Sequence, residues 1–438
     1  MKIMKFGGTS VGSPERIKEV VRLATESGEQ RFVVLSAMSG TTNALVEIAD
    51  YIGKHNTESA LNVLTHLRHK YDKHLKELYT SEKVRQHVAD YLTERFDWLR
   101  SCCIQQMTPA LEREIVAQGE LMSTHMVIGY MEEQGFDAIL IPAFDFMRTG
   151  QHAEPDLKHI RAALSAILEK EGRHQVYLTQ GFICINENGE IDNLQRGGSD
   201  YTACLIGAAL RAEEIQIWTD IDGMHNNDPR FVEGTKPVRH ISFEEAAELA
   251  YFGAKILHPT CIQPARYANV PVRLLNTLDP QAPGTLINNA TEEIGVKAIA
   301  AKDNITAIKV ISSRMLLASG FLARIFQVFD EHDTCIDMVT TSEVGVSLTI
   351  DDTTHLEAIL DDLRKLGIVQ VDSNQCIICV VGDMTAEQHG YCAQVLNALK
   401  EKPIRMICYG GSDHNVSVLV SMEQKQWALQ QLSKHLFE

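Results

Sequence analysis

The sequence KFGGTS, residues 5–10, places a lysine at the end of a short apolar run, and a glycine pair follows at once. Glycines at the end of a strand let backbone N–H groups approach an anion, which favours phosphate as the ligand. The order differs from that of a P-loop, in which the lysine follows the glycines and opens a helix. A strand that ends in a simple Gly-Gly turn has the same pattern, so the hexapeptide alone does not decide between the two.

Strands and helices alternate in the part of the chain around this motif. Residues from about 47 to 135 are mostly helical, with few glycines or prolines and long charged faces. Four apolar runs have the composition of buried strands: FVVLSA (32–37), AILIPAF (138–144), QVYLTQGFICI (175–185) and EIQIWTDIDG (214–223). The pattern predicts an α/β domain over residues 1–290, with an open, mainly parallel sheet sandwiched by helices. Ligands of such sheets gather at the carboxyl ends of the strands, where Lys5, Ser36 and Thr219 are expected.

An internal repeat follows the segment NTLDPQAPGTLINNATEE (276–293), whose Pro, Asn and Thr content is typical of a domain boundary. Residues 291–373 and 374–438 each have the order βαββα, which predicts two small α+β domains. A leading strand at 294–301 could pair with the second of them. Two such domains side by side form an interface, which is a natural place for a small ligand.

Composition limits the classes of function. The chain has 438 residues, 45% apolar and 23% charged, with a net charge of −17, so a general nucleic-acid surface is not expected. No window approaches about 20 apolar residues, and the first residues do not form a secretory signal, so neither a membrane span nor export is expected. The ten cysteines are therefore predicted to be reduced thiols of a cytoplasmic protein.

Two candidate metal motifs have simpler explanations. Cys376 and Cys379 form a CxxC, but they lie in an apolar run that is typical of a buried strand, and no second ligand pair accompanies them. His66, His69 and His74 lie in a polar helical stretch, where a solvated helix face explains them better than a metal site does. We therefore predict no dedicated metal site.

A second glycine motif, QRGGSDYTACLIGAAL (195–210), precedes an amphipathic helix. Ser199 or Asp200 could simply cap that helix. Free N–H groups and the helix dipole also make such an N-terminus an anion site, and Arg196 adds a fork-shaped cation suited to a carboxylate. Lys255 lies in the apolar run FGAKILHP, where a buried charge is costly unless it is used or paired. Together with QGELMS and NDPR, these stretches supply the cations Lys5, Arg196, Arg230 and Lys255 and the carboxylates Glu120, Asp200 and Asp220.

The order of these motifs resembles that of the aspartate kinase family. The matching segments, spread over residues 5–259, are KFGGTSV, LSAMSGTTN, QGELMS, FMRT, AEPD, QGFICINENGEIDNLQRGGSDYTA, IWTDIDG, NDPR and FGAKILHP. The repeat that follows resembles the family's paired ACT regulatory domains, so the resemblance covers nearly the whole chain. It implies the amino-acid-kinase fold and an ATP-dependent phosphotransferase that acts on the side-chain carboxylate of L-aspartate. The product would be 4-phospho-L-aspartate, the entry to lysine, threonine and methionine synthesis.

The resemblance also implies roles for individual residues. Lys5 would hold the ATP phosphates and Asp200 would orient it, and Gly8 completes the catalytic set. The substrate-binding residues implied are Thr42, Glu120, Arg196, Gly198 and Ser199, with Arg196 on the α-carboxylate and Glu120 on the α-ammonium. The nucleotide-binding residues implied are Lys5, Gly7, Gly8, Ser10, Thr219, Asp220, His225, Asp228, Arg230 and Lys255. Mg²⁺ would be carried with ATP. His225 stands where the best-matched members carry a tyrosine, which puts the adenine contact in doubt.

The chemistry fits these residues. The attacking carboxylate has a solution pKa near 3.9, so it is already ionised at neutral pH and needs no general base. The obstacle is electrostatic, because an anion must approach a polyanion. Catalysis should therefore consist of positioning and of charge stabilisation by cations.

The first repeat carries a candidate effector site. Ser319 and Gly320 at a helix start could hold a carboxylate, while Asp337 and Glu343 could meet two ammonium groups, which favours L-lysine over threonine as the inhibitor. The alternative is that the two acids merely solvate a strand edge. The pattern also resembles the lysine-inhibited class of the family, whose pocket is represented here by Met315, Phe321, Leu322, Asp337, Thr341, Ser342 and Glu343, with Ala318 and Cys335 in place of serines. The resemblance implies a homodimer through the ACT-like domains, or a tetramer.

Two other functions stay open at this point. One is another amino-acid kinase with a carboxylate, carbamate or nucleoside phosphate as acceptor, although QGELMS and the paired repeats argue against it. The other is a catalytically inactive amino-acid sensor, although the intact Lys5, Arg196, Asp200 and Lys255 argue against that. The length predicts no fused homoserine dehydrogenase.

Overall fold

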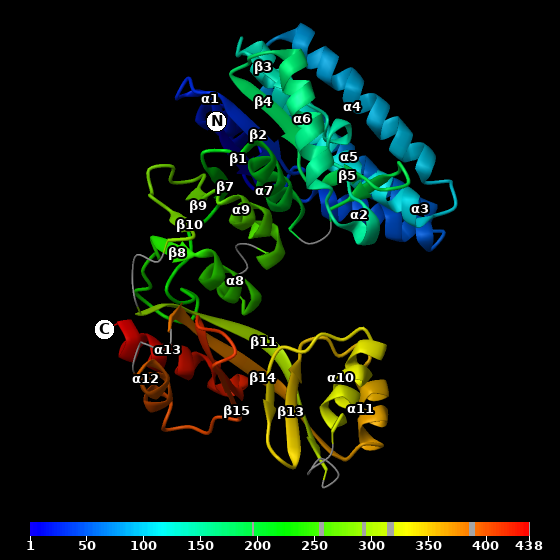
Figure 1. Cartoon of the computed structure of the whole chain (residues 1–438). Helices are drawn as coiled ribbons and strands as arrows, with labels where there is room; N and C mark the ends of the chain where they lie inside the picture. The colour runs from blue at the N-terminus through cyan, green and yellow to red at the C-terminus, as the bar shows by residue number, and fades with distance from the viewer. Residues whose placement is uncertain (195–196, 254–257, 291–294, 313–318, 385–389, 438) are drawn as a thin grey trace. The chain divides into compact units, whose positions relative to one another are not determined.

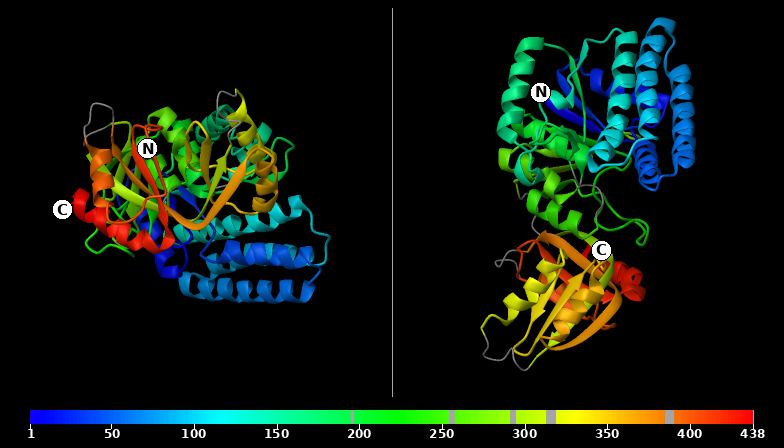
Figure 2. Two further views of the ribbon diagram at one scale, coloured as in Figure 1. Left: turned by 90° about the horizontal axis from the view of Figure 1, so that it is seen from below. Right: turned by 90° about the vertical axis from the view of Figure 1, so that its right-hand side faces the viewer.

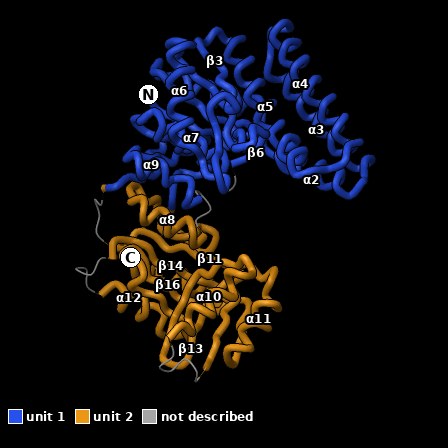
Figure 3. Tube along the Cα trace, turned by 45° about the vertical axis from the view of Figure 1, so that its right-hand side comes forward, with its two compact units in different colours: residues 1–224, 257–289 blue, residues 225–256, 290–438 orange. Residues whose placement is uncertain are grey.

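The computed structural model describes the chain except for residues 195–196, 254–257, 291–294, 313–318, 385–389 and 438 (Figure 1). The chain divides into two compact units, residues 1–224 with 257–289 and residues 225–256 with 290–438 (Figure 3). The units are not contiguous in sequence, so the predicted domain limits stay a prediction. None of the described helices is long and apolar enough to cross a membrane.

A mainly parallel sheet forms the centre of the first unit, as the apolar runs predict. In this unit its strand order is β3-β4-β2-β1-β7-β9-β10, and every adjacent pair is parallel except β9–β10. The strands are β1 (Lys2–Phe6), β2 (Arg31–Leu35), β3 (Ala138–Leu140), β4 (Val176–Gln180), β7 (Ile215–Thr219), β9 (Val272–Asn276) and β10 (Thr285–Asn288). A separate two-stranded sheet pairs β5 (Ile183–Ile185) with β6 (Ile191–Asn193). Because β1, β2, β3, β4, β7 and β9 run parallel, their carboxyl ends lie at one edge of the main sheet.

Helices lie on both faces of this sheet (Figure 2). They are α1 (Pro14–Thr25), α2 (Thr41–Gly53), α3 (Thr57–Leu78), α4 (Glu82–Cys102), α5 (Pro109–Glu133), α6 (Leu157–Glu171), α7 (Gly198–Leu210) and the short α9 (Gln263–Ala268). The helical run predicted from about residue 47 corresponds to α2–α5. Within α2–α5, three helices begin with a side-chain cap. Asn56, Ser81 and Thr108 each accept a backbone N–H from the first turn of α3, α4 and α5. One core joins α1–α5 to one face of β1, β2 and β4.

A single antiparallel sheet runs through the second unit, in the order β12-β13-β11-β14-β16-β15. Two long strands, β11 (Gly295–Ile311) and β14 (Ile368–Asp383), form its centre, and the N-terminal part of β11 pairs with residues 377–383 of β14. The outer strands are β12 (Val339–Thr341), β13 (Gly345–Ile350), β15 (Met406–Tyr409) and β16 (Asn415–Ser421). The two βαββα repeats thus share one continuous sheet.

Each repeat keeps its own core. The helices α10 (Phe321–Glu331) and α11 (Leu356–Arg364) supply one cluster, and α12 (Tyr391–Ala398) and α13 (Lys425–Phe437) supply the other. The unit also contains β8 (His240–Ser242) and α8 (Phe243–Tyr251), which begins with a capping box between Ser242 and Glu245. The predicted combination of an α/β domain with two α+β repeats is confirmed.

Candidate active site

The two glycine motifs meet through an ion pair. Lys5 lies at the end of β1, and its Nζ is 2.7 Å from Oδ1 of Asp200 in the first turn of α7. A β-carbon at Gly7 would lie 3.6 Å from Lys5 Nζ, so the ammonium group lies beside the glycine pair. At Gly8 a β-carbon would be only 2.8 Å from the carbonyl oxygen of Ala37, so only glycine allows this close approach. The structure therefore brings together the three predicted catalytic residues.

The start of α7 is the N-terminus that was predicted as an anion site. Gly197 caps the helix with φ of +76°, a conformation that glycine adopts without strain, and the helix begins at Gly198. Ser199 is buried beside it, and its Oγ accepts a hydrogen bond of 2.9 Å from Ser36 Oγ at the end of β2. The predicted substrate residues Gly198 and Ser199 therefore lie at the carboxyl edge of the sheet.

Glu120 is a buried acid next to the same strand end. Its side chain on α5 is only 3% exposed, and its Oε1 accepts the backbone N–H of Ala37 at 3.1 Å. Its Oε2 is buried and has no hydrogen-bond partner among the residues that the structure describes. Burial raises the pKa of Glu120 to about 8. A cation placed at Oε2 would recover much of the cost of ionising this carboxyl group.

The loop after β2 carries another predicted substrate residue. Thr42 is half-buried in the first turn of α2, which follows Gly40. Lys70 of α3 donates to the carbonyl oxygen of Ser39 in this loop, and burial lowers its pKa. Sequence reasoning missed Lys70, because the polar stretch around it was interpreted as a solvated helix face.

A hydroxyl chain connects the strand ends on the other side of Lys5. Ser10 Oγ lies 2.9 Å from Thr277 Oγ1, which in turn donates to the carbonyl oxygen of Thr219 at 2.5 Å. Thr219 Oγ1 donates to Asp220 Oδ1 at 3.2 Å. Three predicted nucleotide residues are thus joined through Thr277, which sequence reasoning missed. Its position directly after the apolar strand β9 was the available signal.

Three further predicted nucleotide residues, His225, Asp228 and Arg230, lie in the second unit. Arg230 is 77% exposed and makes a bidentate pair with Asp228, with Nη2 at 2.6 Å from Oδ2 and Nε at 2.9 Å from Oδ1. Burial alone would raise the pKa of Asp228, but the hydrogen bonds and charge of Arg230 lower it. His225 Nδ1 lies 3.0 Å from Thr235 Oγ1. The predicted residues Arg196 and Lys255 lie outside the described residues.

The candidate effector residues differ in their surroundings. Gly320 caps α10 with φ of +79°, and Phe321 is buried while Leu322, Thr341 and Glu343 are exposed. Ser342 Oγ donates to the carbonyl oxygen of Gly345. Ser319 lies in the turn before the helix. Met315 and Ala318 lie outside the described residues.

Asp337 requires a correction, because the alternative that it merely solvates a strand edge is wrong. Its side chain is fully buried, and Oδ1 lies 2.6 Å from Lys302 Nζ and accepts the Tyr251 hydroxyl at 2.8 Å. Burial raises the pKa of Asp337, and the hydrogen bond and charge of Lys302 oppose that rise. Glu343, by contrast, is exposed next to β12.

The candidate metal ligands do not form a site among the described residues. None of the ten cysteines, all of them among the described residues, forms a disulfide, and Cys376 and Cys379 are buried in β14. The described residues contain no group of three side chains suited to a metal ion.

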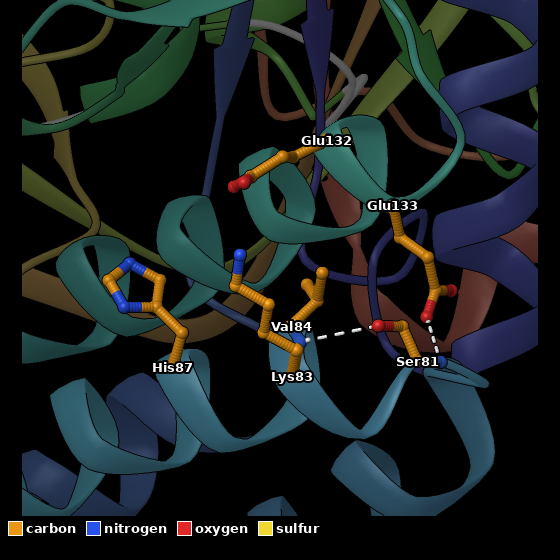
Figure 4. A pocket seen from close by; sticks show the side chains of 6 residues that line it. All are labelled: Ser81, Lys83, Val84, His87, Glu132 and Glu133. Atoms are coloured by element: carbon orange, nitrogen blue, oxygen red, sulfur yellow. Dashed lines mark hydrogen bonds between the residues drawn. The ribbon is translucent and has the colours of Figure 1, made fainter.

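One hollow between α4 and α5, drawn in Figure 4, is lined by Ser81, Lys83, Val84, His87, Glu132 and Glu133, none of which is a predicted site residue.

Comparisons with known proteins agree with this arrangement. The amino acid kinase family profile matches residues 1–276, and an ACT domain profile matches residues 378–436. The lysine-sensitive aspartokinase 3 of Escherichia coli K12 is 35% identical over 100% of this chain and 99% of its own length. Chloroplastic aspartokinase 1 of Arabidopsis thaliana is also 35% identical, over 100% of this chain and 80% of its own.

Two solved structures of E. coli aspartokinase III match at 34% identity over 100% of both chains. The complex with aspartate and ADP, an R-state, gives a TM-score of 0.85. The complex with lysine and aspartate, a T-state, gives a TM-score of 0.82. At this identity and coverage the likeness extends beyond the fold.

Proposed function

Because the chain belongs to the aspartokinase branch of the amino acid kinase family, we propose that it transfers the γ-phosphoryl group of ATP to the side-chain carboxylate of L-aspartate. The products are 4-phospho-L-aspartate and ADP. The observation that carries the proposal is the ion pair between Lys5 and Asp200, which fixes a cation between two glycine motifs at the edge of the sheet. A cation in that position suits the charge that develops on a transferring phosphoryl group.

The second support is the charge balance around Glu120. A buried carboxyl group whose pKa is raised to about 8 is an unfavourable anion unless a cation approaches it. The α-ammonium of aspartate supplies that cation, and we assign it to the unpartnered Oε2. We assign the α-carboxylate to Arg196, whose planar fork suits it, and hydrogen bonds to Thr42 and Ser199. Gly198 leaves its backbone open to the substrate.

The nucleotide is assigned to the glycine pair and to the hydroxyl-rich strand ends. The phosphates would lie against the backbone of Gly7 and Gly8, with Lys5 beside them and Ser10 behind. The N–H of Gly8 would donate to them, because that of Gly7 donates to the carbonyl oxygen of Trp218 at 3.4 Å. Thr219, Asp220, His225, Asp228, Arg230 and Lys255 complete the assignment. Mg²⁺ belongs to the MgATP substrate, where it neutralises phosphate charge, and we assign it no ligand set of the protein.

The reaction then needs no general base. The side-chain carboxylate of aspartate is ionised at neutral pH, and one of its oxygens forms a bond to the γ-phosphorus. The bond from that phosphorus to the β–γ bridging oxygen breaks, and ADP leaves with the electron pair. Lys5 faces the group in transfer while Asp200 holds the ammonium in place, so the protein contributes position and charge.

The direct test of the proposal is ADP release with defined acceptors. ADP formation from MgATP should require L-aspartate, and succinate should replace it poorly because it lacks the ammonium that Glu120 binds. L-glutamate, which is one methylene longer, is the matched control for the position of the side-chain carboxylate. Equal rates with L-glutamate and L-aspartate would favour another member of the amino acid kinase family.

Regulation by L-lysine is part of the proposal. The E. coli relative is named as lysine-sensitive, and its T-state structure contains lysine. Ser319 and Gly320 at the start of α10 would bind the effector's carboxylate, and the exposed Glu343 would bind an ammonium group. Phe321, Leu322, Thr341 and Ser342 would line the pocket with Met315 and Asp337. A homodimer through the ACT-like repeats would let the ligand bridge two subunits, and a tetramer of two such dimers is compatible with it.

A further inference from the structure

The segment that contains Asp228 and Arg230 is fastened to the core of the second unit. Asn226 donates its backbone N–H to the carbonyl oxygen of Lys236 at 2.9 Å, and its side-chain Oδ1 accepts the N–H of Lys236 at 2.8 Å. The carbonyl oxygen of Asn226 accepts the N–H of Ile299 in β11 at 2.9 Å. The loop of residues 225–237 is therefore closed at its base and attached to the central sheet.

Polar side chains then attach the tip of this loop to the C-terminal helix α13. Asn227 is 2% exposed, and its Nδ2 donates to the carbonyl oxygen of Leu429 at 3.1 Å. In the opposite direction, Gln430 Nε2 donates to the carbonyl oxygen of Phe231 at 3.2 Å. The two hydrogen bonds hold the residues directly before Asp228 and directly after Arg230.

A buried lysine of the same helix adds a third attachment. Lys425 is 5% exposed, its Nζ lies 2.7 Å from Oδ2 of Asp303, and it also lies 4.2 Å from the centre of the Phe231 ring. The guanidinium of Arg230 lies 5.8 Å from the centre of the same ring. Val232, the next residue, packs in the core formed with Leu429 and other residues of α13. The Phe231 ring thus connects the exposed Arg230 to a buried charge on α13.

We propose that α13 positions the nucleotide loop, with Asn227, Phe231, Lys425 and Gln430 as positioning residues for ATP. The inference rests on the proposed function, since it takes Asp228 and Arg230 as nucleotide residues. The second ACT-like repeat would then contribute to the ATP site of its own chain and not only to regulation. Its contribution is to hold the exposed arginine in place before the nucleotide arrives, which lowers the ordering cost of binding.

The test compares two glutamines one turn apart on α13. Gln430→Ala removes the hydrogen bond to Phe231 and should raise KM for ATP about threefold to tenfold, the range expected for one hydrogen bond. KM for aspartate should stay within twofold. Gln426→Ala is the matched control, because Gln426 is exposed on the same helix and should leave both constants unchanged.

Substitutions of Lys425 provide a second, independent test. Lys425→Met keeps the length of the side chain but removes the charge next to Phe231, and it should raise KM for ATP more than Gln430→Ala does. Lys425→Arg keeps the charge and should restore most of the affinity. Tryptic cleavage after Arg230 gives a readout that does not depend on activity, since release of the loop should speed cleavage in Gln430→Ala and not in Gln426→Ala.

The outcomes separate the inference from the proposed function. An active wild type in which Gln430→Ala and Lys425→Met leave KM for ATP unchanged, or raise KM for both substrates equally, would overturn the inference alone. An unaltered KM for ATP in Arg230→Ala would overturn it as well, by removing the loop from the nucleotide site. A wild type without aspartate-dependent ADP release would refute the proposed function, and the inference would fail with it.

Discussion

The Nζ of Lys302 lies 2.6 Å from Oδ1 of Asp337, and the Asp337 side chain is completely buried. Asp351 Oδ2 lies 2.8 Å from the same ammonium group, and the Tyr251 hydroxyl donates to Asp337 from α8. The acid that was expected to bind an effector ammonium already has a cation of the chain itself. An incoming lysine must therefore share or displace Lys302 if it is to reach Asp337.

Loss of Lys302 should destabilise the second unit. Lys302→Met leaves the buried Asp337 carboxylate without a cation and should lower the free energy of unfolding by about 3 kcal/mol. Thermal unfolding followed by circular dichroism measures the change. Lys309→Met, at an exposed position of the same strand β11, is the control and should change stability little. Equal, small shifts for both variants would show that the pair contributes little.

Glu343 should be the side chain on which lysine inhibition depends most. It is exposed and free to meet a ligand, whereas Asp337 is engaged. Glu343→Ala should raise the concentration of L-lysine for half-inhibition by about tenfold, the effect expected for loss of one charged hydrogen bond, and should leave the uninhibited rate unchanged. Inhibition curves with L-lysine and L-threonine, measured separately, test the assignment. Inhibition by threonine alone would contradict it.

Lys5 should act mainly on the chemical step. Lys5→Ala removes the cation that faces the transferring phosphoryl group, and kcat should fall by about two orders of magnitude or more. Steady-state kinetics at saturating ATP and aspartate give the value. A variant with kcat within threefold of the wild type would remove Lys5 from the catalytic site and leave only a structural pair with Asp200.

Glu120 should impose a pH dependence on aspartate binding. Its pKa is raised to about 8, so in the free protein the carboxyl group is largely protonated below that pH and must lose its proton to bind the α-ammonium. The affinity for aspartate should therefore rise with pH up to about 8 and then level off. Glu120→Gln should raise KM for aspartate, leave KM for ATP nearly unchanged and abolish this dependence, as pH profiles of kcat/KM would show.

The raised pKa of Glu120 also predicts how protein stability depends on pH. Because burial raises the folded-state pKa above the unfolded value, the native state binds more protons between about pH 4.5 and 8, and stability falls as pH rises through that window. Glu120→Gln should therefore raise the melting temperature at pH 8 relative to the wild type, and the difference should shrink toward pH 5. A variant less stable than the wild type at pH 8 would show that Glu120 is ionised and paired in the free protein.

The parts of the fold that depend on local pattern were predictable from the sequence. Apolar runs such as FVVLSA are typical of strands covered on both faces, and the glycine pairs marked the strand end and helix start that Lys5 and Asp200 connect. The contacts that were missed depend on long-range pairing. Thr277 meets Ser10 across 267 residues, and nothing local in the sequence indicates that pairing.

Asp337 shows the same limit in the regulatory repeats. The local sequence CIDMV (335–339) does not indicate the partners of Asp337, because Lys302 and Tyr251 come from β11 and α8. Lys302 lies in β11, which pairs with β13 of the first repeat and with β14 in the continuous six-stranded sheet.

The most direct measurement of the central claim is to trap the product of phosphoryl transfer. Hydroxylamine converts an acyl phosphate to a hydroxamate, so incubation with MgATP, L-aspartate and hydroxylamine should yield aspartyl hydroxamate in an amount equal to the ADP released. Lys5→Ala should yield about one hundredth as much in the same time. ADP release without hydroxamate, or hydroxamate formation that is unaffected by Lys5→Ala, would contradict the account.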